Sequence, residues 1–397
     1  MTEHLTLCGL EKAGSHETDS FSIRSGGQIV FQTSDGWLDS IRLVLRYGLW
    51  SLGRLEYFVA NLLDSFSSVY PSLETGRSYA TVHDLLEEMS PRGRDGESSH
   101  EMTSLTKISI REKLLQLSIS EELIEELAMV AMKVNYGQFP ENIHGFVGSV
   151  SLAGIQEGLW RVQGGNYRIP LCLLQKSNAK LVHGTVDSLE HKKGKYSVVY
   201  TQAGEEKKSY QDFDIVVVAF PLTKDKSKVK LINIPEVYPG EYQRTLAYLV
   251  HGTLNTAALG FNTDWSVTKN IFFTDRADPV ASISFLLPVD FAPSQEVPSV
   301  YKVFSREKLS REQLHEYFSV IDDVQLVDWL AYPNYKTFPG LGSFHIQPNL
   351  YYLNNIEWAA SAMEMSALAA RNIANLIASK FDSSDESKET QSSKSEL

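Results

Sequence analysis

Residues 341–380 join a short apolar strand, a polar corner and a helix rich in small residues, and this succession constrains the fold more than any other segment. We predict a strand at Leu350–Leu353, a corner that contains Asn354, Asn355 and Glu357, and a helix that begins near Ala359. Small residues allow a helix start to lie close to a ligand, and its free backbone N–H groups attract anionic oxygens. A carboxylate in the corner can accept hydrogen bonds from sugar or ribityl hydroxyls. The segment therefore favours a bound nucleotide cofactor, although an Ala-rich helix that only packs on a sheet has the same pattern.

The charge and composition of the 397-residue chain exclude several other classes of protein. The formal net charge is −12, and the longest basic clusters are the pairs Lys192-Lys193 and Lys207-Lys208, so we predict no nucleic-acid partner. No apolar run approaches the roughly 20 residues of a membrane span, so we predict no transmembrane segment. The histidines show no spacing typical of metal ligands, and we predict no metal site.

The first 149 residues are predicted to form a hairpin followed by helices. Residues 1–35 contain two short strands that turn at Gly26-Gly27, and Ser34 or Asp35 is expected to cap the helix that follows. In residues 36–149, apolar side chains recur every three or four positions, which is typical of helices with one buried face. The four predicted helices are Trp37–Phe66, Val82–Met89, Thr106–Leu117 and Ser120–Val134.

The middle of the chain is predicted to be rich in strands. Alternation over Lys180–Gln211, broken at Lys193-Gly194 and Ala203-Gly204, predicts an antiparallel meander. The β-branched run at 215–218, closed by Pro221, predicts a central strand buried on both faces.

The remaining segments complete this organisation. Alternating residues between 245 and 305 predict four more strands, and a short helix is expected near 311–320. Residues 382–397 are almost free of apolar side chains, so we predict a disordered tail. The two cysteines, Cys8 and Cys172, form no disulfide framework or metal spacing, and we expect both to be free thiols.

Four segments, in order along the chain, resemble the prenylcysteine oxidase family, whose members are also called prenylcysteine lyases and are flavoproteins related to the amine oxidases. The resemblance extends from about Phe21 to the C-terminus. Its most specific pieces are VNYGQ at 134–138, VGSVSLAG at 147–154, WLAYPNYK at 329–336 and YYLNNIEWAASAMEMSALAA at 351–370.

The resemblance implies an α/β (α+β) chain with the FAD/NAD(P)-binding, amine-oxidase-like flavoprotein fold. Such folds open with a strand, a GxGxxG turn and a helix that hold the ADP half of FAD, and no such βαβ unit occurs in this sequence. The expected parts are an N-terminal hairpin region (1–35), the helical part of a substrate domain (36–149), an FAD-domain segment (150–232), the β-rich part of the substrate domain (233–340), a C-terminal FAD-binding strand and helix (341–381) and the tail (382–397).

The resemblance also implies the residues of the binding sites. The expected FAD-binding residues are Gly164, Gly165, Asn166, Val186, Ala219, Pro221, Asn355, Glu357 and Met363. The expected substrate-binding residues are Asn135, Tyr136, Gln138 and Trp160. For several of these the ordinary alternatives remain: a plain turn at the glycines, a strand exit at the proline and a structural hydrogen bond at the glutamate. No residue is assigned a catalytic role, since the flavin performs the difficult step in this chemistry.

The activity implied is that of an FAD-dependent thioether oxidase. It would cleave farnesyl- or geranylgeranyl-cysteine with O₂ to a prenyl aldehyde, cysteine and hydrogen peroxide, during degradation of prenylated proteins. The alternative is a non-catalytic truncated paralogue or isoform that binds lipid or a partner without flavin, and the absence of the GxGxxG turn favours it.

The family implies a lysosomal location. The two ends of the chain carry the sequence features that bear on targeting. Met1–His4 lacks the basic start and apolar stretch of a secretory signal. The last four residues, Lys394–Leu397, resemble an ER-retrieval signal of the KDEL type.

Overall fold

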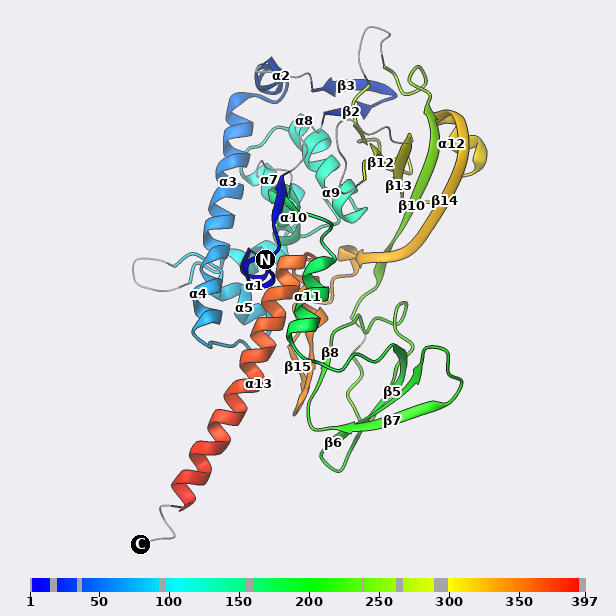
Figure 1. Ribbon diagram of the computed structural model, residues 1–397. Helices are drawn as coiled ribbons and strands as arrows, with labels where there is room; N and C mark the ends of the chain where they lie inside the picture. Colours follow the sequence, from blue (N-terminus) through cyan, green and yellow to red (C-terminus); the bar gives the residue numbers. More distant parts are fainter. Residues whose placement is uncertain are drawn as a thin grey trace. The chain divides into compact units, whose positions relative to one another are not determined.

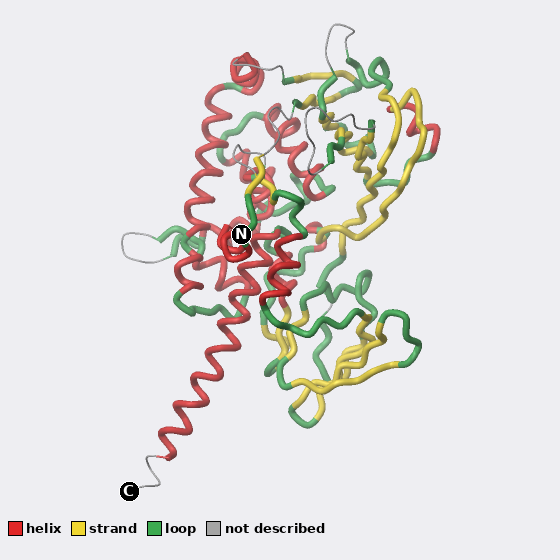
Figure 2. Tube along the Cα trace, in the orientation of Figure 1, coloured by secondary structure: helices red, strands yellow, loops and turns green. Residues whose placement is uncertain are grey.

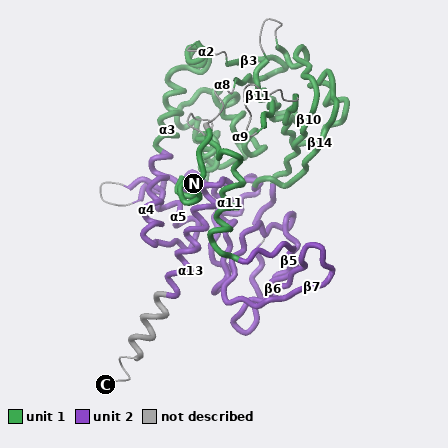
Figure 3. Tube along the Cα trace, in the orientation of Figure 1, with its two compact units in different colours: residues 1–61, 107–179, 243–332 green, residues 62–106, 180–242, 333–397 purple. Residues whose placement is uncertain are grey.

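Figure 1 shows the computed structural model of the chain, and Figure 2 shows its helices and strands. The structure describes residues 2–14, 20–33, 38–92, 98–154, 160–237, 239–261, 267–288 and 299–392. The chain forms two compact units, which are coloured separately in Figure 3. Unit 1 comprises Met1–Asn61, Lys107–Ala179 and Gln243–Tyr332, and unit 2 comprises Leu62–Thr106, Lys180–Tyr242 and Pro333–Leu397.

Unit 1 contains most of the helices predicted from apolar periodicity. They are α2 (Leu38–Tyr47), α3 (Leu49–Ser67, whose end belongs to unit 2), α7 (Ile110–Gln116), α8 (Glu121–Leu123), the π-helical η2 (Ile124–Ala128), α9 (Met129–Tyr136) and α10 (Gly145–Ala153). The prediction of one continuous helix from Trp37 to Phe66 is wrong. Gly48 has a φ of +81°, a left-handed conformation that ends α2 before α3 begins. The predicted caps Ser34 and Asp35, like Trp37, lie outside the described residues.

Unit 1 also holds a seven-stranded sheet of order β14-β10-β13-β12-β11-β2-β3. Its strands are β2 (Phe21–Ser25), β3 (Gln28–Gln32), β10 (Tyr242–Leu254), β11 (Asn270–Phe273), β12 (Val280–Phe285), β13 (Val300–Ser305) and β14 (Phe318–Pro333). The hairpin at Gly26-Gly27 is confirmed, and β11 pairs with β2 in parallel. One face of the sheet forms an apolar core with α12 (Arg311–Tyr317), to which Leu314 and Tyr317 contribute buried side chains.

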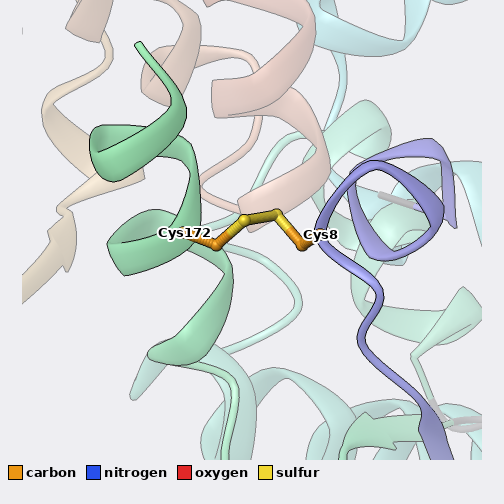
Figure 4. The surroundings of a disulfide bond; sticks show 2 residues. All are labelled: Cys8 and Cys172. Atoms are coloured by element: carbon orange, nitrogen blue, oxygen red, sulfur yellow. A yellow bond between two sulfur atoms is a disulfide. The ribbon is translucent and has the colours of Figure 1, made fainter. Parts of the chain in front are cut away.

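The N-terminal segment is attached to unit 1 by several contacts. Helix α1 (Thr2–Cys8) packs on α11 (Arg168–Lys176), and β1 (Lys12–Gly14) pairs with β4 (Trp160–Val162). Figure 4 shows the disulfide between Cys8 of α1 and Cys172 of α11. The expectation of two free thiols is therefore wrong. A sequence separation of 164 residues gives no local signal for this pairing, which depends on the packing of α1 against α11.

Unit 2 contains the helices α4 (Val69–Glu74), α5 (Val82–Glu88), α6 (Glu101–Ser104) and α13 (Met363–Ser392). Thr81 caps α5 by accepting a hydrogen bond from the backbone N–H of Asp84, as its place before the apolar run suggests. Helix α13 continues to Ser392, past residue 381 where we predict a disordered tail. Residues 382–392 contain neither proline nor glycine, so nothing in the sequence stops the helix there.

Two sheets complete unit 2. The antiparallel meander is confirmed by β5 (Gly184–Lys192), β6 (Lys195–Gln202) and β7 (Lys208–Phe213). Strand β9 (Lys230–Ile232) joins the same sheet in parallel with β5, which gives the order β7-β6-β5-β9. The second sheet has the order β15-β16-β8, from β15 (His345–Gln347), β16 (Leu350–Tyr352) and β8 (Val216–Val218). The prediction that residues 215–218 form a central strand buried on both faces is wrong. Within the described residues β8 is an edge strand whose one neighbour is β16, and Val217 is 39% exposed.

Candidate functional site

Strands β16 and β8 of unit 2 run parallel and end at the same edge of their sheet. Strand β16 pairs with β8 in the register Leu350↔Val216 and Tyr352↔Val218, so the chain leaves both strands side by side. The hydroxyl of Tyr352 accepts a hydrogen bond of 3.0 Å from the backbone N–H of Leu222, which joins the two exits. The carboxyl ends of parallel strands are where open α/β sheets bind ligands. We therefore take this edge as the candidate site.

Two buried polar atoms at this edge have no hydrogen-bond partner. They are Oδ1 of Asn354, which follows β16, and Oγ1 of Thr223, which follows β8. Thr223 is fully buried and Asn354 is 6% exposed. A buried polar atom without a partner costs about 1–3 kcal/mol, so it points to a group that satisfies it. The edge therefore fits a ligand that carries hydroxyl or phosphate groups, such as a flavin nucleotide.

Glu357 provides the carboxylate of this edge. It belongs to the 3₁₀ helix η4 (Leu353–Trp358), and its Oε2 accepts a short hydrogen bond from the hydroxyl of Tyr242. Burial raises the pKa of the Glu357 carboxyl, and the Tyr242 hydrogen bond opposes that rise. Burial, together with this carboxylate, raises the pKa of Tyr242. The tyrosine is therefore the proton donor of the pair.

Aromatic side chains hold η4 in place. Trp358 is 1% exposed and lies edge-on to the rings of Tyr242 and Tyr335, each at 6.4 Å between centroids. The Tyr335 hydroxyl donates to the backbone carbonyl of Glu357 at 3.0 Å and accepts from the N–H of Ser361 at 3.0 Å. The corner between β16 and α13 is therefore held by hydrogen bonds and aromatic contacts on both sides of the carboxylate.

The predicted helix start at Ala359 is displaced. Helix α13 begins at Met363; residues 353–358 form the 3₁₀ helix η4, and residues 359–362 connect the two. Met363 is half exposed at this start. Asn355 is buried, and its Nδ2 donates to the carbonyl of Ser343 at 2.6 Å, so its amide has a structural partner. Cofactor contacts of Asn355 and Met363 remain predictions.

Other predicted cofactor residues of unit 2 lie on β5 and after β8. Ala219 and Pro221 occupy the exit of β8, next to the candidate edge. Val186 stands at an irregularity of β5, opposite Tyr200 of β6. Its side chain and those of β8 line one apolar cavity of about 110 Å³. The structure thus brings β5 and β8 together as the fold requires, while a contact of Val186 with adenine stays a prediction.

The predicted glycines form a tight turn in unit 1. Gly164 and Gly165 have φ values of +78° and +107°, which side chains other than glycine rarely adopt. Oδ1 of Asn166 accepts a hydrogen bond of 2.9 Å from the N–H of Val162 and closes this turn. The turn itself explains these residue types. A flavin contact there remains a prediction.

The predicted substrate residues have separate surroundings in unit 1. Nδ2 of Asn135 donates to Oγ of Ser151 at 2.9 Å, which ties α9 to α10. Tyr136 is buried with its ring 5.3 Å from that of Tyr332. Nε2 of Gln138 donates to the Tyr136 carbonyl at 3.2 Å. Trp160 of β4 packs under the ammonium of Lys12, 4.7 Å from the ring centroid.

The sequence did not predict Tyr242, Asn354 or Thr223 as residues of a binding site. Tyr242 precedes a predicted strand, and only the fold brings it to a glutamate 115 residues away. Asn354 and Thr223 did carry a local signal, because each is a polar residue directly after an apolar strand. Within the described residues, no group of three or more His, Cys, Asp or Glu side chains could hold a metal ion. None of the described helices is long and apolar enough to cross a membrane.

Solved structures define the class of fold. The chain resembles putrescine oxidase, in its wild type bound to putrescine, with a TM-score of 0.54 over 95% of this chain and 85% of that one, at 10% sequence identity. A single-residue mutant of the same enzyme gives a TM-score of 0.55. The chain thus has the amine-oxidase-like flavoprotein fold. The prenylcysteine lyase family model matches residues 30–390, and the chain belongs to that family.

Curated relatives agree with this assignment. The chain is 35% identical to human prenylcysteine oxidase 1 over 373 residues, which are 89% of this chain and 72% of the relative. It is 32% identical to human prenylcysteine oxidase 1-like over 394 residues, which are 95% of this chain and 77% of that relative. Family and fold identify an oxidoreductase, and they do not favour the non-catalytic alternative.

Proposed function

We propose that this protein oxidises the thioether of a prenylcysteine, with FAD as its cofactor and O₂ as the electron acceptor. The observation that carries the proposal is the family match over residues 30–390, which includes the whole candidate edge of unit 2. The unpartnered atoms of Asn354 and Thr223 at that edge support a bound nucleotide.

The residues of the edge have distinct roles in this proposal. Glu357, held by the Tyr242 hydroxyl, accepts hydrogen bonds from hydroxyl groups of the cofactor. Asn354 Oδ1 accepts another, and Thr223 Oγ1 can donate or accept. When bound, the flavin supplies the capacity to accept a hydride from carbon. The chain supplies binding, orientation and the exclusion of bulk water.

The net reaction balances with O₂ and water as the co-reactants. One C–H bond and the C–S bond of the prenyl carbon break, and water supplies the oxygen of the aldehyde. The sulfur leaves as the thiol of cysteine. The two electrons removed from the prenyl carbon reduce O₂ to hydrogen peroxide, so each turnover consumes one O₂ and one water.

The test is expression of this 397-residue chain, an absorbance scan from about 350 to 500 nm and a peroxide assay with S-farnesylcysteine. The expected result is a yellow protein that releases peroxide, farnesal and cysteine in equal amounts. S-methylcysteine is the control substrate, because it keeps the amino acid and lacks the prenyl group. A folded, flavin-loaded protein without peroxide release would overturn the proposed activity, and a folded protein that takes up no flavin would support the non-catalytic alternative.

We further propose that the protein passes through the oxidising secretory pathway and works in a compartment that this pathway supplies, such as the lysosome. The Cys8–Cys172 disulfide supports this, because disulfides persist in secretory compartments and are rare in the cytosol. A cysteine-alkylation assay on protein from its own cells tests it. Two blocked cysteines are expected without reductant, whereas full alkylation of both would place the protein in a reducing compartment.

A further inference from the structure

A small cavity lies inside unit 1, between helix α9 and the seven-stranded sheet. Its volume is about 10 Å³, the space of roughly one water-sized group, and it is partly open. It is lined by Lys133, Val134, Gly137, Thr245, Ala281, Phe304, Ser305, Arg306 and Tyr332. Two of these residues belong to the VNYGQ segment at 134–138, but the cationic groups of the cavity lie outside that segment.

Lys133 contributes a buried ammonium group to this cavity. The side chain is 1% exposed, and Nζ donates to the backbone carbonyls of Asp275 at 2.9 Å and Val280 at 3.4 Å. An ammonium group has three donors, so one N–H of Lys133 is not used by these two carbonyls. Burial lowers the pKa of Lys133 to about 8. The ammonium lacks a full set of partners.

Arg306 contributes the second cation. One terminal nitrogen donates to the carbonyls of Arg276 at 2.8 Å and Asp278 at 3.2 Å, and the guanidinium lies 4.7 Å from the ring centroid of Phe139. Its Nε is buried and has no hydrogen-bond partner. Burial also lowers the pKa of Arg306, and the charges of Glu307 and Asp278 oppose this shift only in part.

The neighbouring carboxylates are used elsewhere. Both oxygens of Asp275 accept from the backbone N–H of Gly26 at 3.0 Å. Asp278 accepts from the Tyr317 hydroxyl at 3.0 Å and pairs with Arg24 at 3.5 Å.

The charges of Asp275, Asp278 and Glu307 act on the two cations from a distance, but none of these carboxylates is in direct contact with either cation. In the described part of the chain, neither Lys133 nor Arg306 forms an ion pair with a carboxylate. Buried charges are normally paired, and a buried cation without an anion is costly.

A third unsatisfied group faces the same cavity. Thr245 is 9% exposed, and its Oγ1 is buried without a hydrogen-bond partner. The remaining wall is apolar and aromatic, with Phe304 and Tyr332 among the lining residues and Tyr136 in contact with Tyr332. The cavity thus combines two cations, a hydroxyl and an apolar rim, which suits a carboxylate attached to an apolar molecule.

We propose that Lys133, Arg306 and Thr245 form a subsite for the α-carboxylate of the amino-acid end of the substrate. This inference rests on the proposed function, because a prenylcysteine is the ligand that joins such a carboxylate to an apolar chain. A carboxylate oxygen has the size that the cavity accepts, and it provides acceptors for the free N–H of Lys133, Nε of Arg306 and the Thr245 hydroxyl.

The test compares S-farnesylcysteine with its methyl ester, which lacks the carboxylate and keeps the amine and the prenyl group. We expect the wild-type chain to have a kcat/KM about 10- to 100-fold higher for the acid, the range of a lost charge-assisted hydrogen bond. Lys133→Met and Arg306→Met are each expected to lower kcat/KM for the acid by about 10-fold or more and to leave the ester within about 2-fold. Thr245→Val is nearly isosteric and should lower kcat/KM for the acid by a few-fold.

A matched control variant is available in the same sheet. Lys302→Met removes another partly buried lysine, which packs on the ring of Phe304 at 4.5 Å and does not line the cavity. This variant should keep the wild-type ratio of acid to ester. Circular dichroism confirms folding of each variant, and Thr245→Val is the variant least prone to misfold if the two cation variants are unstable.

Binding without turnover separates this subsite from the proposed function. Calorimetric titration under nitrogen, where no O₂ is present for turnover, gives the affinities for the acid and for the ester. Their ratio measures the preference for the carboxylate whether or not the chain oxidises either compound. Tighter binding of the acid without peroxide release would retain the subsite and overturn the activity. The subsite would be overturned if the wild-type chain bound or oxidised the acid and the ester equally well, or if it bound neither. It would also be overturned if Lys133→Met weakened binding of the acid and of the ester to the same extent.

Discussion

The hydroxyl of Tyr242 donates a short hydrogen bond to Oε2 of Glu357 and thereby fixes the carboxylate of the strand–helix corner in unit 2. The backbone N–H of Tyr242 is bound in turn to Oδ2 of Asp225 at 2.7 Å, and the ammonium of Lys226 lies 4.7 Å from its ring centroid. The tyrosine is therefore held from its backbone, its ring and its hydroxyl. Glu357 is presented to the ligand edge in one orientation.

Tyr242→Phe is expected to lower the free energy of unfolding by about 1–3 kcal/mol at pH 7, because the buried Glu357 carboxylate loses the Tyr242 donor and keeps only the hydrogen bond with Asn354. The pKa of Glu357 is already raised by burial, and loss of the donor raises it further. A carboxyl with a raised folded pKa destabilises the folded state as pH rises through that pKa. The cost should therefore be smaller at pH 5, where protonation of Glu357 reduces the buried charge. Urea titration at both pH values measures it.

Tyr210→Phe is the matched control, because Tyr210 is 81% exposed in the same unit. Its free energy of unfolding should equal that of the wild type at both pH values. Flavin retention gives a second reading, since Tyr242→Phe should lose more cofactor than Tyr210→Phe on gel filtration. Equal stability and equal flavin content in the two variants would show that Tyr242 does not position Glu357.

Gly240→Ala tests the packing that surrounds Trp358. Gly240 has a φ of +52°, and a Cβ there would lie 2.2 Å from Cη2 of the Trp358 ring. Trp358 is fully buried, so the alanine must displace either the ring or the loop, at a cost of roughly 1–3 kcal/mol. We expect a lower melting temperature and stronger quenching of the tryptophan fluorescence by acrylamide. Gly204→Ala is the control, since its φ is also positive and no atom lies within 4 Å.

Local turn chemistry explains which parts of the fold were predictable. The hairpin at Gly26-Gly27 and the meander turn at Lys193-Gly194 are formed by residues adjacent in sequence, and both are confirmed. Strand β14 (Phe318–Pro333) was missed because most of its residues are exposed, so that its sequence lacks a regular apolar alternation. It is positioned instead by pairing with β10.

The candidate site was predictable only in part, for a similar reason. Glu357 has a recognisable sequence context, because a carboxylate between apolar residues after a strand needs a partner. Tyr242 and Lys133 have no such context, and each acquires its role from groups more than 100 residues away in sequence. Contacts of this kind depend on the tertiary fold, which a single sequence pattern does not determine.

Removal of the disulfide tests the attachment of the N-terminal segment. Cys8→Ser with Cys172→Ser opens a loop of 164 residues, and we expect the free energy of unfolding of unit 1 to fall by about 2–4 kcal/mol. The apolar contacts of Leu5 with Val162 and Ile169 form a small cluster, so α1 should detach before the rest unfolds. Limited proteolysis should cleave residues 2–14 first in the double variant. Equal cleavage rates in wild type and variant would show that packing alone holds the segment.

The buried ammonium of Lys133 makes a prediction for alkaline pH. Its pKa is lowered to about 8 in the folded chain, by burial first and by the charges of Arg306 and Arg276, against the opposing effect of Asp278 and Asp275. In the unfolded chain a lysine has a pKa of ~10.4. Between the folded and the unfolded pKa, the unfolded state therefore binds more protons than the folded state. The stability contribution of Lys133 must therefore rise with pH across this window.

The measurement is the difference in free energy of unfolding between the wild type and Lys133→Met at pH 7, 8, 9 and 10. Groups common to both proteins cancel in that difference. The free energy of unfolding of the wild type should rise relative to that of the variant by up to about 1.4 kcal/mol per pH unit between pH 8 and 10, because each unit of pKa difference corresponds to that free energy. A difference that is constant over this range would mean that the ammonium is as well stabilised in the cavity as in water, and would remove the reason to expect an anion beside it.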